Sequence, residues 1–108
     1  MFWSNNPTDS HSIFAFQATL TPASVANIVA AEQTFTVSPG TNSSTLPKGT
    51  TLKTTDHILC TGPGTGNASG MISCRVSSGT QVIIGWVNPT AGGLTPASGV
   101  YKFFVIRT

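Results

Sequence analysis

Acidic residues lie close to histidines at two places in this 108-residue chain, which makes them the first candidates for catalysis. Asp9 and His11 lie near the N-terminus, and Asp56 and His57 are adjacent. A Ser-His-Asp site needs a carboxylate that orients the imidazole and a nucleophile on its other side. Adjacent strand residues point to opposite faces, so Asp56 cannot easily orient His57. Because a nucleophile-elbow motif is also missing, we expect no enzymatic activity.

Cofactor and metal sites are indicated just as weakly. The chain has three acidic residues, Asp9, Glu32 and Asp56. This number does not favour a hydrolase that uses a pair of carboxylates. A metal site would need ligands from distant segments. The glycine-rich segment 62–70 lacks the Gly-Lys-Ser/Thr ending of a phosphate loop, so it is interpreted as a hairpin connection. We expect neither a cofactor nor a metal ion.

Cys60 and Cys74 flank that glycine-rich segment and could be cross-strand neighbours. A disulfide that closes this loop would stabilise the fold by about 3 kcal/mol in the chain-entropy view. In a reducing compartment the default is instead two free, buried thiols, which is the alternative we favour. The N-terminus has no basic region followed by an apolar core, so we expect a protein made and used without export.

The low charge content is the most unusual property of the composition. Only 7% of residues are charged, against a usual value near 25%, and the net charge is +2 without any lysine or arginine cluster. Nucleic acid is therefore not an expected partner, and no apolar run is long enough for a membrane span. Soluble monomers usually keep apart by charge, so this composition favours a protein that functions in an assembly. The plainer alternative is a β domain with a Thr/Ser-rich surface.

Alternating apolar and polar residues predict an all-β fold of six to eight short antiparallel strands. We expect a single-domain β-sandwich or small barrel, of which a jelly roll is one form. The expected strands are 12–20, 28–37, 56–61, 70–77, 81–88 and 100–107. Ser78-Gly79 predicts a tight hairpin, and the last two strands have two apolar faces, as expected of central strands or of a subunit contact. Segment 23–31 could form a short helix, or it could lead into the strand 28–37.

Two segments outside these strands are candidates for partner contacts. Residues 1–11 form either a frayed terminus or an arm that precedes the domain 12–108, with Phe2, Trp3 and His11 as its contact residues. Residues 38–55 are predicted to form a surface loop that contains Lys48 and Lys53. Long ordered loops tend to make contacts, so these two lysines are candidate contact residues. Trp86 is either a core residue, which its alternation with apolar neighbours favours, or an exposed platform for a sugar.

Several motifs, in a fixed order, resemble those of small virion proteins of tailed bacteriophages. The motifs are AEQTFTV at 31–37, MISCRVS at 71–77, VNPTAG at 87–92 followed by LTP at 94–96, and a closing Y-x-F-x-V-I-R strand at 101–107. The resemblance covers about residues 28–108. The N-terminal segment is longer than in that group, and the loop 38–55 also departs from its pattern.

The resemblance implies a capsid decoration or cement protein on the outside of a phage head. It further implies a homotrimer that binds the major capsid protein where capsid subunits meet, with assembly in the host cytoplasm. We place the final strand near the trimer axis. The rival hypothesis is a glycan-binding β domain of a phage fibre or tail, for which Trp86 or Tyr101 would have to be exposed.

Overall fold

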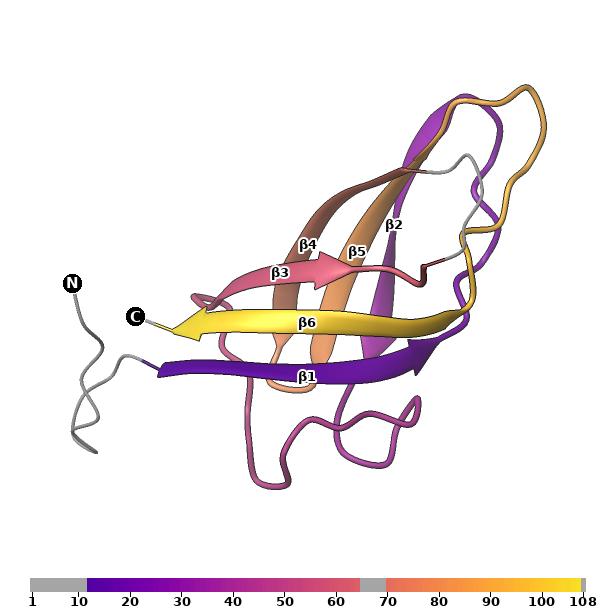
Figure 1. The fold of residues 1–108 in the computed structure, drawn as a ribbon. Helices are drawn as coiled ribbons and strands as arrows, with labels where there is room; N and C mark the ends of the chain where they lie inside the picture. The colour runs from indigo at the N-terminus through magenta and orange to yellow at the C-terminus, as the bar shows by residue number, and fades with distance from the viewer. Residues whose placement is uncertain (1–11, 65–69, 108) are drawn as a thin grey trace.

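The computed structural model describes residues 12–64 and 70–107, and within them it contains six strands and no helix (Figure 1). The strands are β1 (Ser12–Leu20), β2 (Val29–Thr36), β3 (His57–Thr61), β4 (Gly70–Ser78), β5 (Gln81–Asn88) and β6 (Gly99–Arg107). They form two antiparallel three-stranded sheets, in the orders β1-β6-β3 and β2-β5-β4. The all-β prediction is confirmed.

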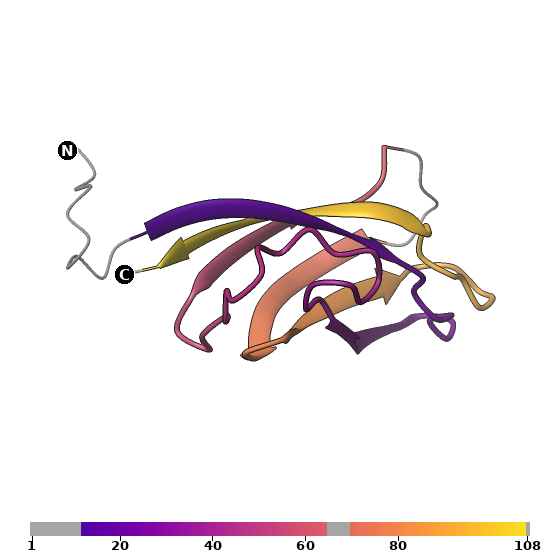
Figure 2. The ribbon, with the colours of Figure 1, turned by 90° about the horizontal axis from the view of Figure 1, so that it is seen from below.

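The two sheets form the layers of a sandwich (Figure 2). Inward and outward side chains alternate along β1, β3 and β6, as expected. Trp86 and Tyr101 point inward and are 2% exposed, so Trp86 belongs to the core. Their rings meet edge to face, with centroids 6.2 Å apart. The buried apolar residues of both sheets are Phe16, Ala18, Leu20, Phe35, Ile58, Val76, Val82, Ile84, Trp86, Tyr101, Phe103 and Val105.

Two alternatives from the sequence are decided by this arrangement. The six described strands fall short of the eight of a jelly roll, so the sandwich is of a simpler kind. Segment 23–31 is not helical: Val25 forms an isolated bridge with Leu94, and the chain then turns at Asn27 and Ile28 into β2. The expected hairpin at Ser78-Gly79 is present between β4 and β5.

The segment 38–56 is not the simple surface loop that its polar composition predicts. Leu46 and Leu52 are 2% exposed and belong to the hydrophobic core, and the segment that carries them runs along the side of the sandwich (Figure 2). Next to them the segment lies along the free edge of β1: the Thr45 amide donates to the Gln17 carbonyl and the Thr19 amide donates to the Asn42 carbonyl, both at 2.8 Å. The segment therefore covers an edge that could otherwise pair with another chain.

A buried ion pair fixes the end of this segment to the last strand. The Arg107 guanidinium donates to both carboxylate oxygens of Asp56 at 2.8 Å and to the Thr51 carbonyl at 2.9 Å. The Lys53 amide also donates to this carboxylate, whose side chain has no exposed surface. The hydrogen bond from Arg107 holds the pKa of Asp56 below its usual value, against the opposite effect of burial.

At the opposite end of the sandwich, the Asn88 side chain fixes the positions of two loops by hydrogen bonds. Its side chain is fully buried, and its amide nitrogen lies 2.8–3.2 Å from three carbonyl oxygens, those of Val25, Ala26 and Gly92. Its amide oxygen accepts from the backbone and hydroxyl of Thr90. The VNPTAG motif is therefore an Asn-centred turn that joins two neighbouring loops.

Replacing Arg107 by alanine leaves the Asp56 carboxylate buried without its cation. We expect a loss of about 3–5 kcal/mol in the free energy of unfolding at pH 7, measured by urea titration. Because the pKa of Asp56 is lowered in the folded state, the stabilisation is present above the unfolded pKa of about 3.9 and is lost as pH falls through the folded pKa. The difference between Arg107→Ala and the parent should therefore shrink in acid.

The control is Arg75→Ala, which breaks the pair of Arg75 with Glu32 at 3.0 Å, where both side chains are more than half exposed. Exposed pairs contribute at most about 1 kcal/mol, so this variant should stay close to the parent. Equal losses in the two arginine variants would contradict the assignment of Asp56–Arg107 as the structural pair.

Candidate interaction surfaces

The outer face of the β1-β6-β3 sheet is apolar at one end. The register aligns His57, Ile106 and Ile13 in one row across the three strands, and Leu59, Phe104 and Ala15 in the next. Leu59 is 64% exposed, Phe104 41% and Ile13 39%. We call Ile13, Ala15, Leu59, Phe104 and Ile106 the apolar face. Beyond it the outward residues become polar, with Thr61, Lys102 and Gln17 in the following row.

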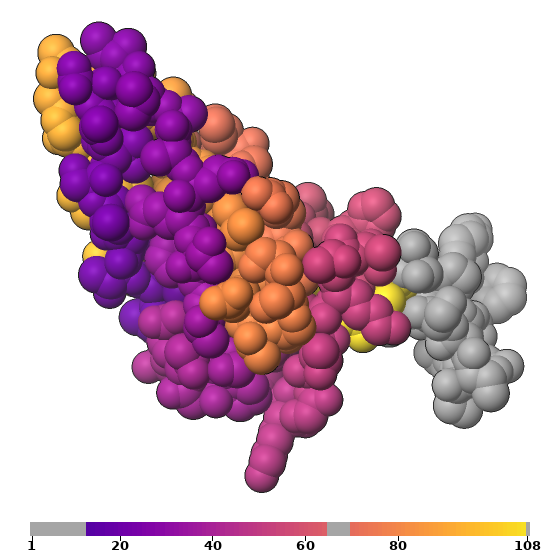
Figure 3. Space-filling model, turned by 180° about the vertical axis from the view of Figure 1, so that it is seen from behind, coloured from indigo at the N-terminus to yellow at the C-terminus, as the bar shows by residue number. Residues whose placement is uncertain are grey.

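The outer face of the other sheet mixes polar and apolar residues, among them Ile72, which is 59% exposed (Figure 3 views the molecule from that side). The ion pair of Glu32 with Arg75 spans it, and Thr34 and Thr36 line the β2 side. The outer face of the β1-β6-β3 sheet thus has contiguous apolar rows at one end, whereas an ion pair and hydroxyl groups separate the apolar residues on the other sheet. Soluble monomers rarely expose a contiguous apolar patch without a partner, so the apolar face is the candidate interaction surface.

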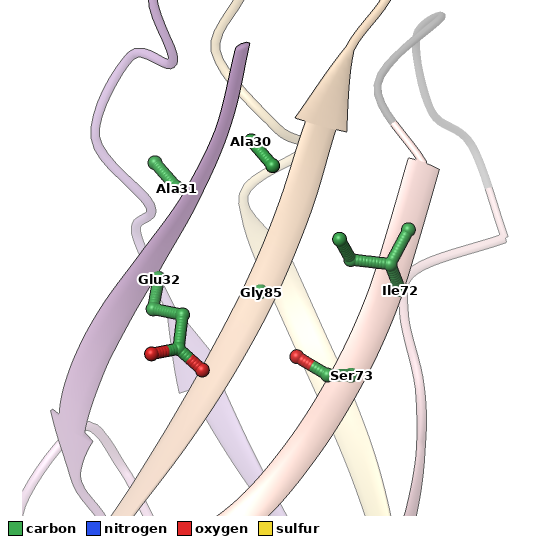
Figure 4. Close-up of a pocket in the computed structure, with 6 residues that line it drawn as sticks. All are labelled: Ala30, Ala31, Glu32, Ile72, Ser73 and Gly85. Carbon is green, nitrogen blue, oxygen red and sulfur yellow. The ribbon is translucent and has the colours of Figure 1, made fainter.

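A shallow hollow of about 170 Å³ lies over Gly85 on the β2-β5-β4 sheet (Figure 4). It is lined by Ala30, Ala31, Glu32, Ile72, Ser73 and Gly85. The hollow exists because residue 85 has no side chain: a Cβ there would collide with the Ser73 hydroxyl. It offers one carboxylate, already paired with Arg75, and one hydroxyl, Ser73, so it can hold a small apolar group but has no base to activate a nucleophile.

Of the contact residues predicted from the sequence, the described part of the chain contains Lys48 and Lys53, and the two are not brought together. Lys48 and Lys53 are exposed and lie on separate turns of the segment 38–56, closed by the hydrogen bonds from Thr50 to Pro47 and from Asp56 to Lys53. Phe2, Trp3 and His11 lie outside the described residues, so their roles stay predictions.

The catalytic candidates are separated as expected. Asp56 points inward to Arg107, whereas the neighbouring His57 is exposed on the outer face of its sheet. Asp9, like His11, lies outside the described residues. Within residues 12–64 and 70–107 no three His, Cys, Asp or Glu side chains are grouped so that they could hold a metal ion. The same part of the chain contains no helix long and apolar enough to cross a membrane.

Ile28 is a surface feature that sequence reasoning missed. It lies in the turn before β2 with φ +52°, in the left-handed region that β-branched residues avoid, and its side chain is 70% exposed. Val29 beside it is also exposed. The sequence Asn27-Ile28-Val29 is typical of the start of a strand, and nothing in it indicates a strained turn.

Comparisons with protein-family models, with curated proteins and with solved structures find no match to this chain.

We predict that the backbone strain at Ile28 can be relieved by glycine. Ile28→Gly and Ile28→Ala both remove the exposed side chain, but only glycine adopts positive φ without a steric penalty. The glycine variant should be about 1 kcal/mol more stable than the alanine variant, as measured by equilibrium denaturation. If alanine is equal to or better than glycine, the left-handed conformation at this residue is wrong.

Proposed function

We propose that this chain is a non-enzymatic virion protein that decorates and cements the outside of a bacteriophage capsid. In this proposal it binds the major capsid protein and associates with itself as a homotrimer. The observation that carries the proposal is the apolar face: an outward sheet surface in a chain that has almost no charge to keep copies apart. A cement protein acts by burying area across subunit boundaries, which stabilises the assembled shell by linkage.

The motifs behind the phage resemblance have structural roles here. Segment 31–37 lies in and just after β2, where Phe35 enters the core and the Gln33 amide exchanges two hydrogen bonds with the Ala23 backbone. The segment 87–92 is the Asn88-centred turn, and the closing strand β6 is the centre of its sheet. The motifs therefore support a shared architecture and leave the function to the surfaces.

The glycan-binding alternative loses its two candidate residues. Trp86 and Tyr101 are each 2% exposed, and the Tyr101 hydroxyl donates to the Ala97 carbonyl at 2.6 Å. Neither ring can stack on a sugar while the sandwich is folded. Of the aromatic side chains in the described residues, Phe104 is the large exposed one, and it belongs to the apolar face.

A second and third copy of this chain are the occupants that we assign to the apolar face. Ser12 is the register partner of Arg107, so residues 1–11 join the sandwich at the same end as the apolar face. If three such faces converge on an axis, the three arms begin next to one another at one end of the trimer. In this proposal Phe2 and Trp3 of the three copies contact one common partner, the capsid.

We predict that Leu59→Lys disrupts the oligomer without unfolding the domain. Leu59 is exposed on an edge strand, where lysine is well tolerated, but three charges would be brought together at the axis. Light scattering should give about three times the 11.2 kDa chain mass for the parent and a single chain for the variant.

The matched control is Ile72→Lys on the other sheet, where Ile72 is 59% exposed, close to the value for Leu59. This variant should retain the mass of the parent. A monomeric parent, or equal dissociation of both variants, would contradict self-association through the apolar face.

We further predict that removal of residues 2–11 weakens capsid binding while the sandwich stays folded. The measurement is cosedimentation with purified undecorated capsids, with melting of the free protein as the check on folding. Phe2→Ser together with Trp3→Ser should reproduce most of the loss, because aromatic anchors contribute most of the energy of typical interfaces. Unchanged occupancy would refute the role of the arm, and a parent that ignores capsids would refute the proposed function.

A further inference from the structure

Cys60 and Cys74 lie on the two edge strands where the sandwich is open. Cys60 is in β3 and Cys74 in β4, which belong to different sheets, so they are not the cross-strand neighbours that the sequence indicated. The two strands nevertheless contact each other along this side of the molecule. Both thiols are free, as expected, but each is only partly buried.

The two cysteines converge on one place. Both pack against the core from opposite sheets, and both line a hollow of about 210 Å³ whose walls come from residues 58–60 and 71–74. The two side chains lie close enough for each to shift the pKa of the other. The hollow gives a small molecule access to sulfur atoms that the rest of the fold holds in place.

We propose that Cys60 and Cys74 are an oxidative modification site that reacts with a low-molecular-weight disulfide, such as oxidised glutathione, to form an intersheet disulfide. The inference rests on the placement of these two residues across the open edge of the sandwich. Its chemistry is independent of the proposed function.

The reaction proceeds by two thiol–disulfide exchanges. The thiolate of Cys74 attacks one sulfur of oxidised glutathione, forms a mixed disulfide and releases one glutathione thiolate. The Cys60 thiolate then attacks the Cys74 sulfur and releases the second glutathione. Two electrons and two protons pass from the cysteine pair to the glutathione, which leaves as two thiols.

The order of attack follows from the environment of each sulfur. The hydrogen bond between the thiols lowers the pKa of Cys74, whereas the same bond and burial raise that of Cys60. We therefore take Cys74 as the first attacker and Cys60 as the resolving residue, an order that the single-cysteine variants below test. Because β3 and β4 share no backbone ladder, the new bond would be the covalent tie between the two layers at this edge.

Under the proposed function, the two cysteines would be reduced before release of the particle and oxidised after it. The chain would fold with reduced thiols inside a reducing cytoplasm, and the tie would form after release of the particle into an oxidising medium. This last step alone rests on the proposed function. The thiol reaction can be tested on the free protein, so its failure and the failure of capsid binding are distinguishable.

The experiment is incubation of the reduced protein in glutathione redox buffers. We expect the chain to lose the mass of two hydrogen atoms, peptide mapping to join the segments containing Cys60 and Cys74, and the melting temperature to rise by roughly 10 °C or more. Dithiothreitol should reverse all three changes.

Cys60→Ser and Cys74→Ser are the matched controls. Each should gain the mass of one glutathione at most, without the rise in melting temperature, and Cys60→Ser should form its adduct faster because it keeps Cys74. The parent protein alone is decisive if a variant does not fold. Two stable glutathione adducts on one parent chain, disulfide-linked dimers, or oxidation without a gain in melting temperature would overturn the proposal.

Discussion

The buried pair of Asp56 and Arg107 is the interaction on which the closure of this sandwich depends. It attaches the end of a largely irregular segment, residues 38–56, to the strand at the centre of one sheet. That segment in turn carries Leu46 and Leu52 into the core and satisfies the free edge of β1. A buried carboxylate is costly unless fully paired, and here two guanidinium nitrogens and a backbone amide surround it. The pair therefore selects one position for a segment whose composition specifies none.

Each three-stranded sheet has two edge strands, and these edges differ in what covers them. The β1 edge is covered by residues 42–45, and Gln33 of β2 holds the Ala23 backbone with a pair of amide hydrogen bonds. At β3 and β4 the described structure has side chains in place of a backbone ladder, among them the two thiols. The covered edges limit pairing with foreign strands. The side between β3 and β4 is therefore where side chains, and not a backbone ladder, connect the two layers.

The strands could be predicted because their alternation is a local property of the sequence. Alternation predicts that Phe103 and Phe104, adjacent in β6, lie on opposite faces, and the structure places the first at 1% exposure and the second at 41%. Sheet order is not local, so nothing in the sequence indicated that Leu59 and Ile13 would lie on either side of β6 and form the apolar face. The burial of Leu46 and Leu52 was missed for a related reason: isolated leucines among turn residues carry no period. Ile28 shows the converse case, in which a strand-forming residue occupies a turn.

The low charge of the chain and the apolar face have one common explanation. Of the eight charged side chains, Glu32, Arg75, Asp56 and Arg107 neutralise one another in pairs, which leaves Lys48, Lys53 and Lys102 as the cations of the described surface outside these pairs. Lys102 lies one row beyond Phe104, on the same outer face, and the other two lie on the segment 38–56. Repulsion between copies is therefore small, and hydrophobic burial at the apolar face meets little opposition. Under the proposal of self-association, the absence of charge from the apolar face favours contact between copies, and Lys102 one row beyond it marks where the polar surface begins.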